Sequence, residues 1–235
     1  MSNPQDPARS DRHTGTHLTR TRACCDRCAE LTGVDGAGVA IFASDTTRDL
    51  VYATDTIAEQ VDELQFTLRE GPCLTAYRTS VPEIHPDLAD PTATRWPMFT
   101  PEVLDLGVRA LFAFPLAVGN ATNIGVLELY RTRPGPLETE HYRTATDYEA
   151  ALGPTVVAEL DPARISSSMM DPALFPRGNV HIAAGMLAVQ LQISAVDALA
   201  RLQAMAYAQH RRITHIAHDI IIHHLTLDPD NTPDA

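Results

Sequence analysis

The sequence of 235 residues contains no lysine, so all 18 of its cationic side chains are arginine. A phosphate-cradling loop of the Gly-x-x-x-x-Gly-Lys type is therefore excluded. The sequence also lacks a Gly-x-Ser-x-Gly nucleophile elbow and a His-Glu-x-x-His zinc motif. No set of catalytic residues can be nominated, and we expect a protein that is not an enzyme and carries no cofactor.

Long apolar runs are also missing. None approaches the ~18–20 residues that a helix needs to span a bilayer. The first residues are polar and charged, and they lack the apolar region of a signal peptide. We therefore expect a cytoplasmic protein with no membrane partner.

Cysteine is scarce, and three of the four cysteines fall in the segment Cys24-Cys25-x-x-Cys28. A structural zinc site would need two separated pairs on turns. In the helical pattern around them, Cys24, Cys28 and Leu31 share one face, which favours a role as small core residues. Redox sensing by Cys25 or Cys28 and metal binding stay open as alternatives.

Charge is distributed unevenly along the chain. The whole sequence has a net charge of −12, but residues 177–227 contain four arginines and only two acids, which gives this segment a charge of +2. Six histidines add to its basic character. A small basic segment attached to an acidic body indicates a module that binds a polyanion.

Hydrophobic patterns divide the chain into two structured parts. We expect residues 16–160 to form the first domain and residues 177–227 the second, with a disordered N-terminus at 1–15, a linker at 161–176 and a disordered tail at 228–235. The first part alternates helical and strand patterns, and the predicted elements are a helix at 16–32, strands at 37–43 and 50–54, helices at 56–66 and 72–79, a strand at 81–84, a helix at 95–106, strands at 108–118 and 124–131, and a helix at 137–160 interrupted near Gly153-Pro154. This order predicts an antiparallel sheet with helices packed on it, an α/β or α+β domain.

The second part is predicted to be all helical. Apolar residues recur at helical spacing in three short segments, at 179–191, from Ser194 to Gln209, and from Ile213 to His224. Ser194 and Asp197 resemble the start of a capping box. About 50 residues of this kind predict a compact three-helix bundle.

Motifs in both parts resemble known families. Residues 69–134 carry Arg69-Glu70-Gly71-Pro72-Cys73, Arg95-Trp96-Pro97, Gly107-Val108-Arg109-Ala110, Phe114-Pro115-Leu116 and Ile124-Gly125-Val126-Leu127-Glu128-Leu129-Tyr130-Arg131. This series resembles the GAF sensor domain of actinobacterial regulators, which implies a ligand-sensing α/β fold with an antiparallel sheet.

The C-terminal helices resemble the ANTAR domain, a three-helix domain that binds RNA and prevents transcription termination. The resemblance lies in Ala183-Ala184-Gly185-Met186-Leu187, Asp197-Ala198-x-x-x-Leu202 and Ile216-Ala217. Three polar positions depart from the usual pattern: Ala184 stands where lysine is common, Gln203 where arginine is common, and His210 where asparagine is common.

The two resemblances together imply a transcription antitermination regulator. Its GAF-like domain would sense a small ligand or a partner, and its ANTAR-like domain would bind a nascent RNA hairpin as part of a homodimer. The helix at 137–160 is the predicted coupling element. The three departures motivate an alternative, a diverged ligand-sensing or protein-interaction module that no longer binds RNA.

Candidate RNA-binding residues lie on the second and third C-terminal helices. Arginine, hydrogen-bonding groups and planar side chains are the groups that read RNA loops. The candidates are Arg201, Gln203, His210, Arg211, Arg212, His215 and His218.

Candidate ligand-binding residues belong to the first domain. A GAF fold is expected to offer a concave site between its sheet and the covering helices. The aromatic and soft residues expected to line it, together with one acid in an apolar strand, are Tyr52, Phe66, Cys73, Trp96, Phe112, Phe114 and Glu128. Glu128 is predicted to be a buried carboxyl group with a perturbed pKa.

Overall fold

The computed structural model of the chain describes residues 18–90, 95–119, 122–160 and 177–223. The predicted disordered N-terminus at 1–15, the linker at 161–176 and the tail at 228–235 lie outside these residues.

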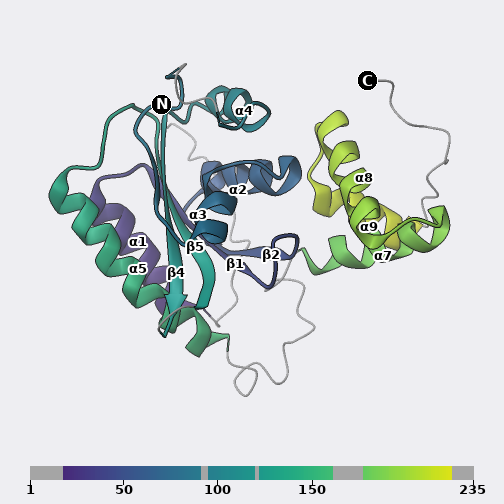
Figure 1. The fold of residues 1–235 in the computed structure, drawn as a ribbon, viewed down its shortest axis with the longest axis horizontal. Helices are drawn as coiled ribbons and strands as arrows, with labels where there is room; N and C mark the ends of the chain where they lie inside the picture. Colours follow the sequence, from purple (N-terminus) through teal and green to yellow (C-terminus); the bar gives the residue numbers. More distant parts are fainter. Residues whose placement is uncertain (1–17, 91–94, 120–121, 161–176, 224–235) are drawn as a thin grey trace, which may run out of the picture.

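Five strands form one antiparallel sheet in the order β2-β1-β5-β4-β3 (Figure 1). Their bounds are Gly36–Phe42 for β1, Arg48–Ala53 for β2, Glu83–His85 for β3, Ala110–Val118 for β4 and Thr122–Arg131 for β5. The long hairpin of β4 and β5 lies inside the sheet, and the short strands β2 and β3 form its edges. The predicted antiparallel sheet is confirmed.

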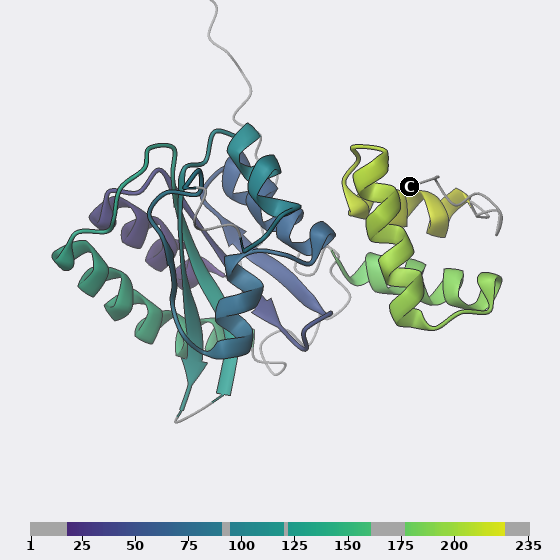
Figure 2. The ribbon, with the colours of Figure 1, turned by 45° about the horizontal axis from the view of Figure 1, so that its top comes forward.

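Helices cover both faces of this sheet (Figures 1 and 2). One face packs against α1 (Thr19–Thr32) and α5 (Thr139–Glu159), and the other against α2 (Thr56–Leu68), α3 (Pro72–Thr79) and α4 (Phe99–Asp105). Successive side chains of a strand point to opposite faces. Phe112 and Phe114 of β4 therefore join the core under α1 and α5, whereas Leu111 between Phe112 and Ala110 faces α2 and α4.

Helix α1 buries a different stripe from the one that the sequence predicted. The buried residues are Thr21, Cys25, Cys28, Ala29 and Thr32, while Leu31 is 41% exposed. Burial raises the pKa of the Cys28 thiol to about 12 and raises that of Cys25 as well. Such thiols stay protonated and unreactive, which agrees with the core role. No group of three or more potential metal ligands occurs within the described residues.

Helix α5 runs without a break through Gly153 and Pro154, so the predicted interruption is wrong. Proline removes one intrahelical hydrogen bond, but the carbonyl that loses its partner belongs to Ala150, which is exposed to solvent. Gly153 is buried directly against the backbone carbonyl of Ala117 in β4. The dipeptide therefore serves close packing between helix and sheet.

The C-terminal part contains the three predicted helices, α7 (Gly178–Leu191), α8 (Ala195–Ala208) and α9 (Ile213–His223). Ser194 caps α8, because its side chain accepts a hydrogen bond from the Asp197 amide at 3.1 Å. The helices share an apolar core that also includes Phe66 of α2. No single helix among the described residues is long and apolar enough to cross a membrane; α7 and α8 reach the required length and composition only as a pair bent by 110°.

The tight approach of α5 to the sheet gives a first prediction. Gly153→Ala would place a methyl group against the Ala117 carbonyl, so we expect it to lower the free energy of unfolding by about 2 kcal/mol. Gly185→Ala in α7 is the matched control, because a methyl group there meets open space. The control should be neutral or stabilising by about 0.5–1 kcal/mol, and urea denaturation measures both. Equal effects of the two substitutions would contradict this role of Gly153.

Candidate functional site

Helix α2 lies between the sheet and the C-terminal helices (Figure 1). Asp55 caps its first turn by accepting a hydrogen bond from the Ala58 amide at 2.9 Å. Its apolar residues Ala58 and Val61 face the sheet, and its acids Glu59, Asp62 and Glu63 occupy two adjacent turns. The helix therefore presents carboxylates toward whatever packs on its outer side.

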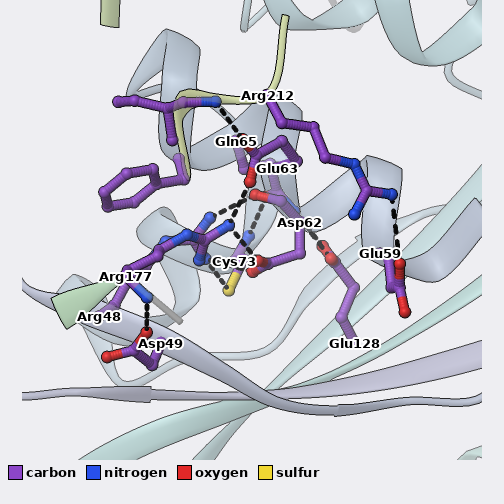
Figure 3. A network of polar contacts seen from close by, with 12 residues as sticks. Arg48, Asp49, Glu59, Asp62, Glu63, Gln65, Cys73, Glu128, Arg177 and Arg212 are labelled. Carbon is purple, nitrogen blue, oxygen red and sulfur yellow. Dashed lines mark hydrogen bonds and ion pairs between the residues drawn. The ribbon is translucent and has the colours of Figure 1, made fainter. Parts of the chain in front are cut away.

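Asp62 lies between two buried arginines (Figure 3). One carboxylate oxygen is 3.0 Å from Nη1 of Arg48, and the other is 2.6 Å from Nη2 of Arg177. All three side chains are only 3–4% exposed. Removing such charges from water is costly unless each one is paired. The second arginine belongs to the residue that precedes α7, so this pairing joins the two parts of the chain.

Further contacts hold Arg177 in place. Its Nη2 is 3.0 Å from Oε2 of Glu63, and its backbone amide donates to Oδ1 of Asp49 at 2.9 Å. Its guanidinium lies over the ring of Phe66, with Cζ 4.2 Å from the ring centroid. A cation over an aromatic face within about 6 Å is stabilised by the ring quadrupole. Backbone, charge and ring contacts thus fix the start of the C-terminal part.

The network continues into the sheet through Gln65 (Figure 3). Its Nε2 donates to both carboxyl oxygens of Glu128, at 2.9 and 2.7 Å, and its Oε1 accepts from the backbone amide of Cys73 at 2.8 Å. Nη1 of Arg48 also donates to the Cys73 sulfur at 3.2 Å. A continuous chain of polar contacts therefore leads from strand β5 to the start of α7.

The surroundings of Glu128 disfavour its ionised form. Burial, reinforced by the negative charge of Asp62, raises its pKa to about 8. Three acids, Asp49, Asp62 and Glu63, already contact Arg48 and Arg177 in this cluster. An ionised Glu128 would add a further negative charge to it.

The motif around Gly71 places these groups. Gly71 has φ 129°, a conformation open to glycine, and a side chain there would overlap Gln65. Glu70 accepts hydrogen bonds from the amides of Met98 and Phe99 at 2.9 and 3.2 Å and so caps α4. Arg69 adopts φ 56°, the left-handed region that favours glycine. The motif thus joins α2, α3 and α4 around Gln65.

Beneath this network lies a small cavity of about 10 Å³, lined in part by Cys73, Glu128, Asp62 and Tyr130. A space of this size holds about one water molecule. The space beside Glu128, between strands β1 and β5 and the inner side of α2, therefore admits nothing larger in this structure.

A family profile described as "GAF domain" matches residues 20–147, more than half of the chain. The chain belongs to the GAF domain family. The sequence resemblance in the first part is thereby confirmed, and the fold is a GAF α/β fold followed by a C-terminal helical region.

Solved structures share this GAF fold. The domain of a putative two-component sensor histidine kinase from Sinorhizobium meliloti 1021 is 18% identical with a TM-score of 0.51, covering 64% of this chain and 96% of that one. The third GAF domain of Slr1393 from Synechocystis, in its photoproduct state, is 16% identical with a TM-score of 0.50, covering 64% and 99%. None of the curated proteins compared with the chain matches it. These comparisons give no support to an ANTAR domain.

The seven candidate pocket residues of the GAF domain are not brought together. Cys73 and Glu128 line the small cavity, and Glu128 is buried with a raised pKa as predicted. Phe112 and Phe114 lie on the opposite face of the sheet, because alternate residues of β4 point to opposite faces and these two point toward α1 and α5. Trp96 packs edge-on against Phe99 at 6.3 Å.

The other two candidates lie away from the small cavity. Tyr52 is on the edge strand β2 and donates to Asp26 at 2.6 Å. Phe66 belongs to the apolar core of the C-terminal helices. The spacing of apolar residues along a strand or helix predicts which residues share a face. It does not predict which of the faces borders the cavity.

The seven candidate RNA-binding residues also separate into two groups. Gln203 is buried, and its Nε2 donates to the Phe66 carbonyl at 2.8 Å. Arg212 pairs with Glu59 at 3.3 Å, and Arg211 pairs with Asp219 at 2.6 Å. The remaining four, which are exposed, are Arg201, His210, His215 and His218.

The uneven charge of the chain thus has an intramolecular counterpart. Arg177 and Arg212 pair with acids of α2, and within the described residues Arg211 pairs inside its own helical unit. Sequence patterns alone do not distinguish Asp62, Glu63 or Arg48 from other charged residues. The available signal was the group of three acids on α2, which complements the positive segment that follows the linker.

The raised pKa of Glu128 gives a second prediction. Its folded pKa of about 8 exceeds its ordinary value of 4.5, so the folded state keeps a proton that the unfolded state releases. Stability is therefore lost as the pH rises from about 4.5 to about 8. Glu128→Gln should remove this loss. Between pH 5 and pH 8 the free energy of unfolding of the variant should therefore rise by roughly 3 kcal/mol relative to that of the native protein.

Urea denaturation at pH 5, 6.5 and 8 measures this difference. Glu140→Gln, an exposed position in the first turn of α5, is the control and should follow the native pH profile. A Glu128→Gln variant whose stability stays parallel to that of the native protein across this range would show that Glu128 ionises normally.

Proposed function

We propose that this protein is a signal-responsive regulator in which the GAF domain senses a small ligand or partner and α7–α9 act as the output. The observation that carries the proposal is the buried polar network that runs from Glu128 through Gln65, Cys73, Arg48 and Asp62 to Arg177. It connects the interior of the GAF domain to the residue that begins the output helices.

Coupling follows from the small size of the cavity under α2. A ligand larger than a water molecule can enter the small cavity beside Glu128 only if α2 or α3 moves outward. The same α2 carries Glu59, Asp62 and Glu63, which hold Arg212 and Arg177. Ligand binding and docking of the output helices thus compete for the position of one helix, and each changes the affinity of the other equally.

The output that we propose is binding of an RNA hairpin. His215 and His218 lie on α9 and Arg211 lies shortly before it. All three are exposed and form a surface suited to phosphates and unstacked bases. In the docked arrangement His210 and Arg211 border a groove whose other wall bears Glu102 and Asp105. Those carboxylates repel phosphate, so docking is the inactive state and undocking the active one. A homodimer would present two such faces and raise the affinity.

A protein-interaction output is the second candidate. Helix α7 exposes Ile182 and Val189, which are 55% and 80% exposed and lie on one side of the helix at a spacing of seven residues. Exposed apolar residues grouped on one face favour contact with another protein. We propose no catalytic role and a cytoplasmic location under either candidate.

Docking gives the third prediction. Arg177→Gln removes a buried positive charge and leaves Asp62 and Glu63 with fewer partners, so docking should weaken by about 3 kcal/mol. Hydrogen exchange at α2 and α8, followed by mass spectrometry, should become faster. Arg201→Gln on the exposed side of α8 is the control and should leave exchange unchanged. Unchanged exchange in Arg177→Gln would show that this arginine does not hold the two parts together.

RNA binding gives the fourth prediction. Selection from transcribed RNA pools would supply the hairpin, and titration at several salt concentrations would measure the affinity. We expect Arg177→Gln to bind at least about fivefold more tightly than the native protein, because it shifts the population toward the undocked state. Adding Arg211→Gln, His215→Gln and His218→Gln to that variant should reverse the gain and flatten the salt dependence. If no variant binds RNA at low salt, the RNA output is wrong and the protein-interaction output remains.

A further inference from the structure

A second cavity, of about 180 Å³, lies at the junction between the GAF domain and the output helices. Its walls come from α1, from the edge strand β2, from α2 and from the residues around the starts of α7 and α9. This cavity is separate from the small cavity beside Glu128. Leu50 is the one lining residue that the two cavities share.

Three guanidinium groups from three different parts of the chain border this cavity. They belong to Arg22 of α1, Arg177 before α7 and Arg212 before α9. Nε of Arg22 and Nη1 of Arg177 are buried nitrogen donors with no hydrogen-bond partner. The side chain of Arg177 is only 4% exposed. Buried donors without a partner are costly, and two of them around one cavity indicate a place for an acceptor.

The carboxylates at the cavity do not satisfy these donors. Both oxygens of Glu63 are engaged, Oε1 by the Ile213 amide at 3.0 Å and Oε2 by Nη2 of Arg177 at 3.0 Å. Oε2 of Glu59 contacts Arg212 at 3.3 Å (Figure 3). Arg22 stacks over the ring of Tyr52, 5.5 Å from its centroid, and forms no ion pair within the described residues. The residues that line the cavity include three arginines and two acids, and Arg177 also pairs with Asp62 behind it.

The remaining surface favours a small organic group. Leu50, Val51 and Ala53 of β2 supply apolar area, and Thr214 supplies a hydroxyl at the start of α9. The N-terminus of a helix attracts anions. The N-terminus of α9 already does so, because the Ile213 amide donates a hydrogen bond to the Glu63 carboxylate.

We propose that this junction cavity binds a small oxyanion, a carboxylate or phosphate group on a short apolar body. The oxyanion accepts hydrogen bonds from Arg22 and Arg177, and the apolar body lies on β2. Arg22 belongs to the GAF domain and Arg177 to the output part, so the ligand bridges them and stabilises the docked state. This site goes beyond the proposed function, because the ligand sensed under α2 would open the docked arrangement, whereas this one closes it.

Isothermal titration of the full chain with inorganic phosphate and, separately, with butyrate tests the site. We expect saturable binding of at least one of them below about 10 mM. Arg22→Gln should weaken binding at least about tenfold, because a charge-assisted hydrogen bond is lost. Arg27→Gln, an exposed arginine on the same helix that pairs with Glu30, is the matched control and should bind like the native protein.

Glu59→Gln provides a test with the opposite sign. It releases Arg212 from its ion pair and removes a negative charge from the cavity, so binding should become severalfold tighter. Preference for butyrate would assign the site to carboxylates and preference for phosphate to phosphoryl groups. Absence of saturable binding of both anions, or equal affinity in Arg22→Gln and the native protein, would overturn the proposal.

Hydrogen exchange separates this proposal from the proposed function. Exchange at α2 and α8 should slow when the bound anion is present, because the ligand holds both parts. Suppose that Arg177→Gln weakens docking but the native protein binds neither anion. This result would rule out the anion site and leave the proposed regulatory function standing.

Discussion

The pairing of one buried carboxylate, Asp62, with two buried arginines organises the molecule. Arg48 comes from the edge strand and Arg177 from the position before α7, so a single acid on α2 joins sheet, covering helix and C-terminal part. A buried ion pair adds little stability compared with well-packed apolar groups, but an unpaired member is strongly unfavourable. This asymmetry makes the docked arrangement specific, because any other position of Arg177 would leave charges buried and unpaired.

Helix α2 consequently has two roles, one on each of its sides. Its inner side closes the space above Glu128, and its outer side receives the output helices. In the proposed function, a change at either side of α2 would be transmitted as a displacement of the whole helix rather than through a long chain of small adjustments. Two discrete arrangements of such an element are the physical basis of a switch.

Sequence patterns predicted the elements well but not the contacts between distant segments. The helix at Pro72–Thr79 and the capping by Ser194 depend on neighbouring residues, and the structure has both. The pairing of Arg177 with Glu63 joins residues 114 positions apart, and no local pattern specifies it. The basic segment looked like a surface for an external polyanion, whereas part of its charge is used inside the molecule. Gln203 likewise departs from the expected arginine and contacts the backbone of Phe66.

The shared position of Phe66 has a consequence for how such proteins are assembled from parts. Its ring completes the apolar core of α7–α9 although it belongs to the GAF domain. The output helices are therefore not a self-sufficient cassette. Fusing them to a different sensor would preserve their function only if the recipient helix offered an aromatic residue and an acid in the places of Phe66 and Asp62. Transfer of α7–α9 from this chain to another sensor is thus restricted by the turn of α2 that carries Asp62 and Phe66.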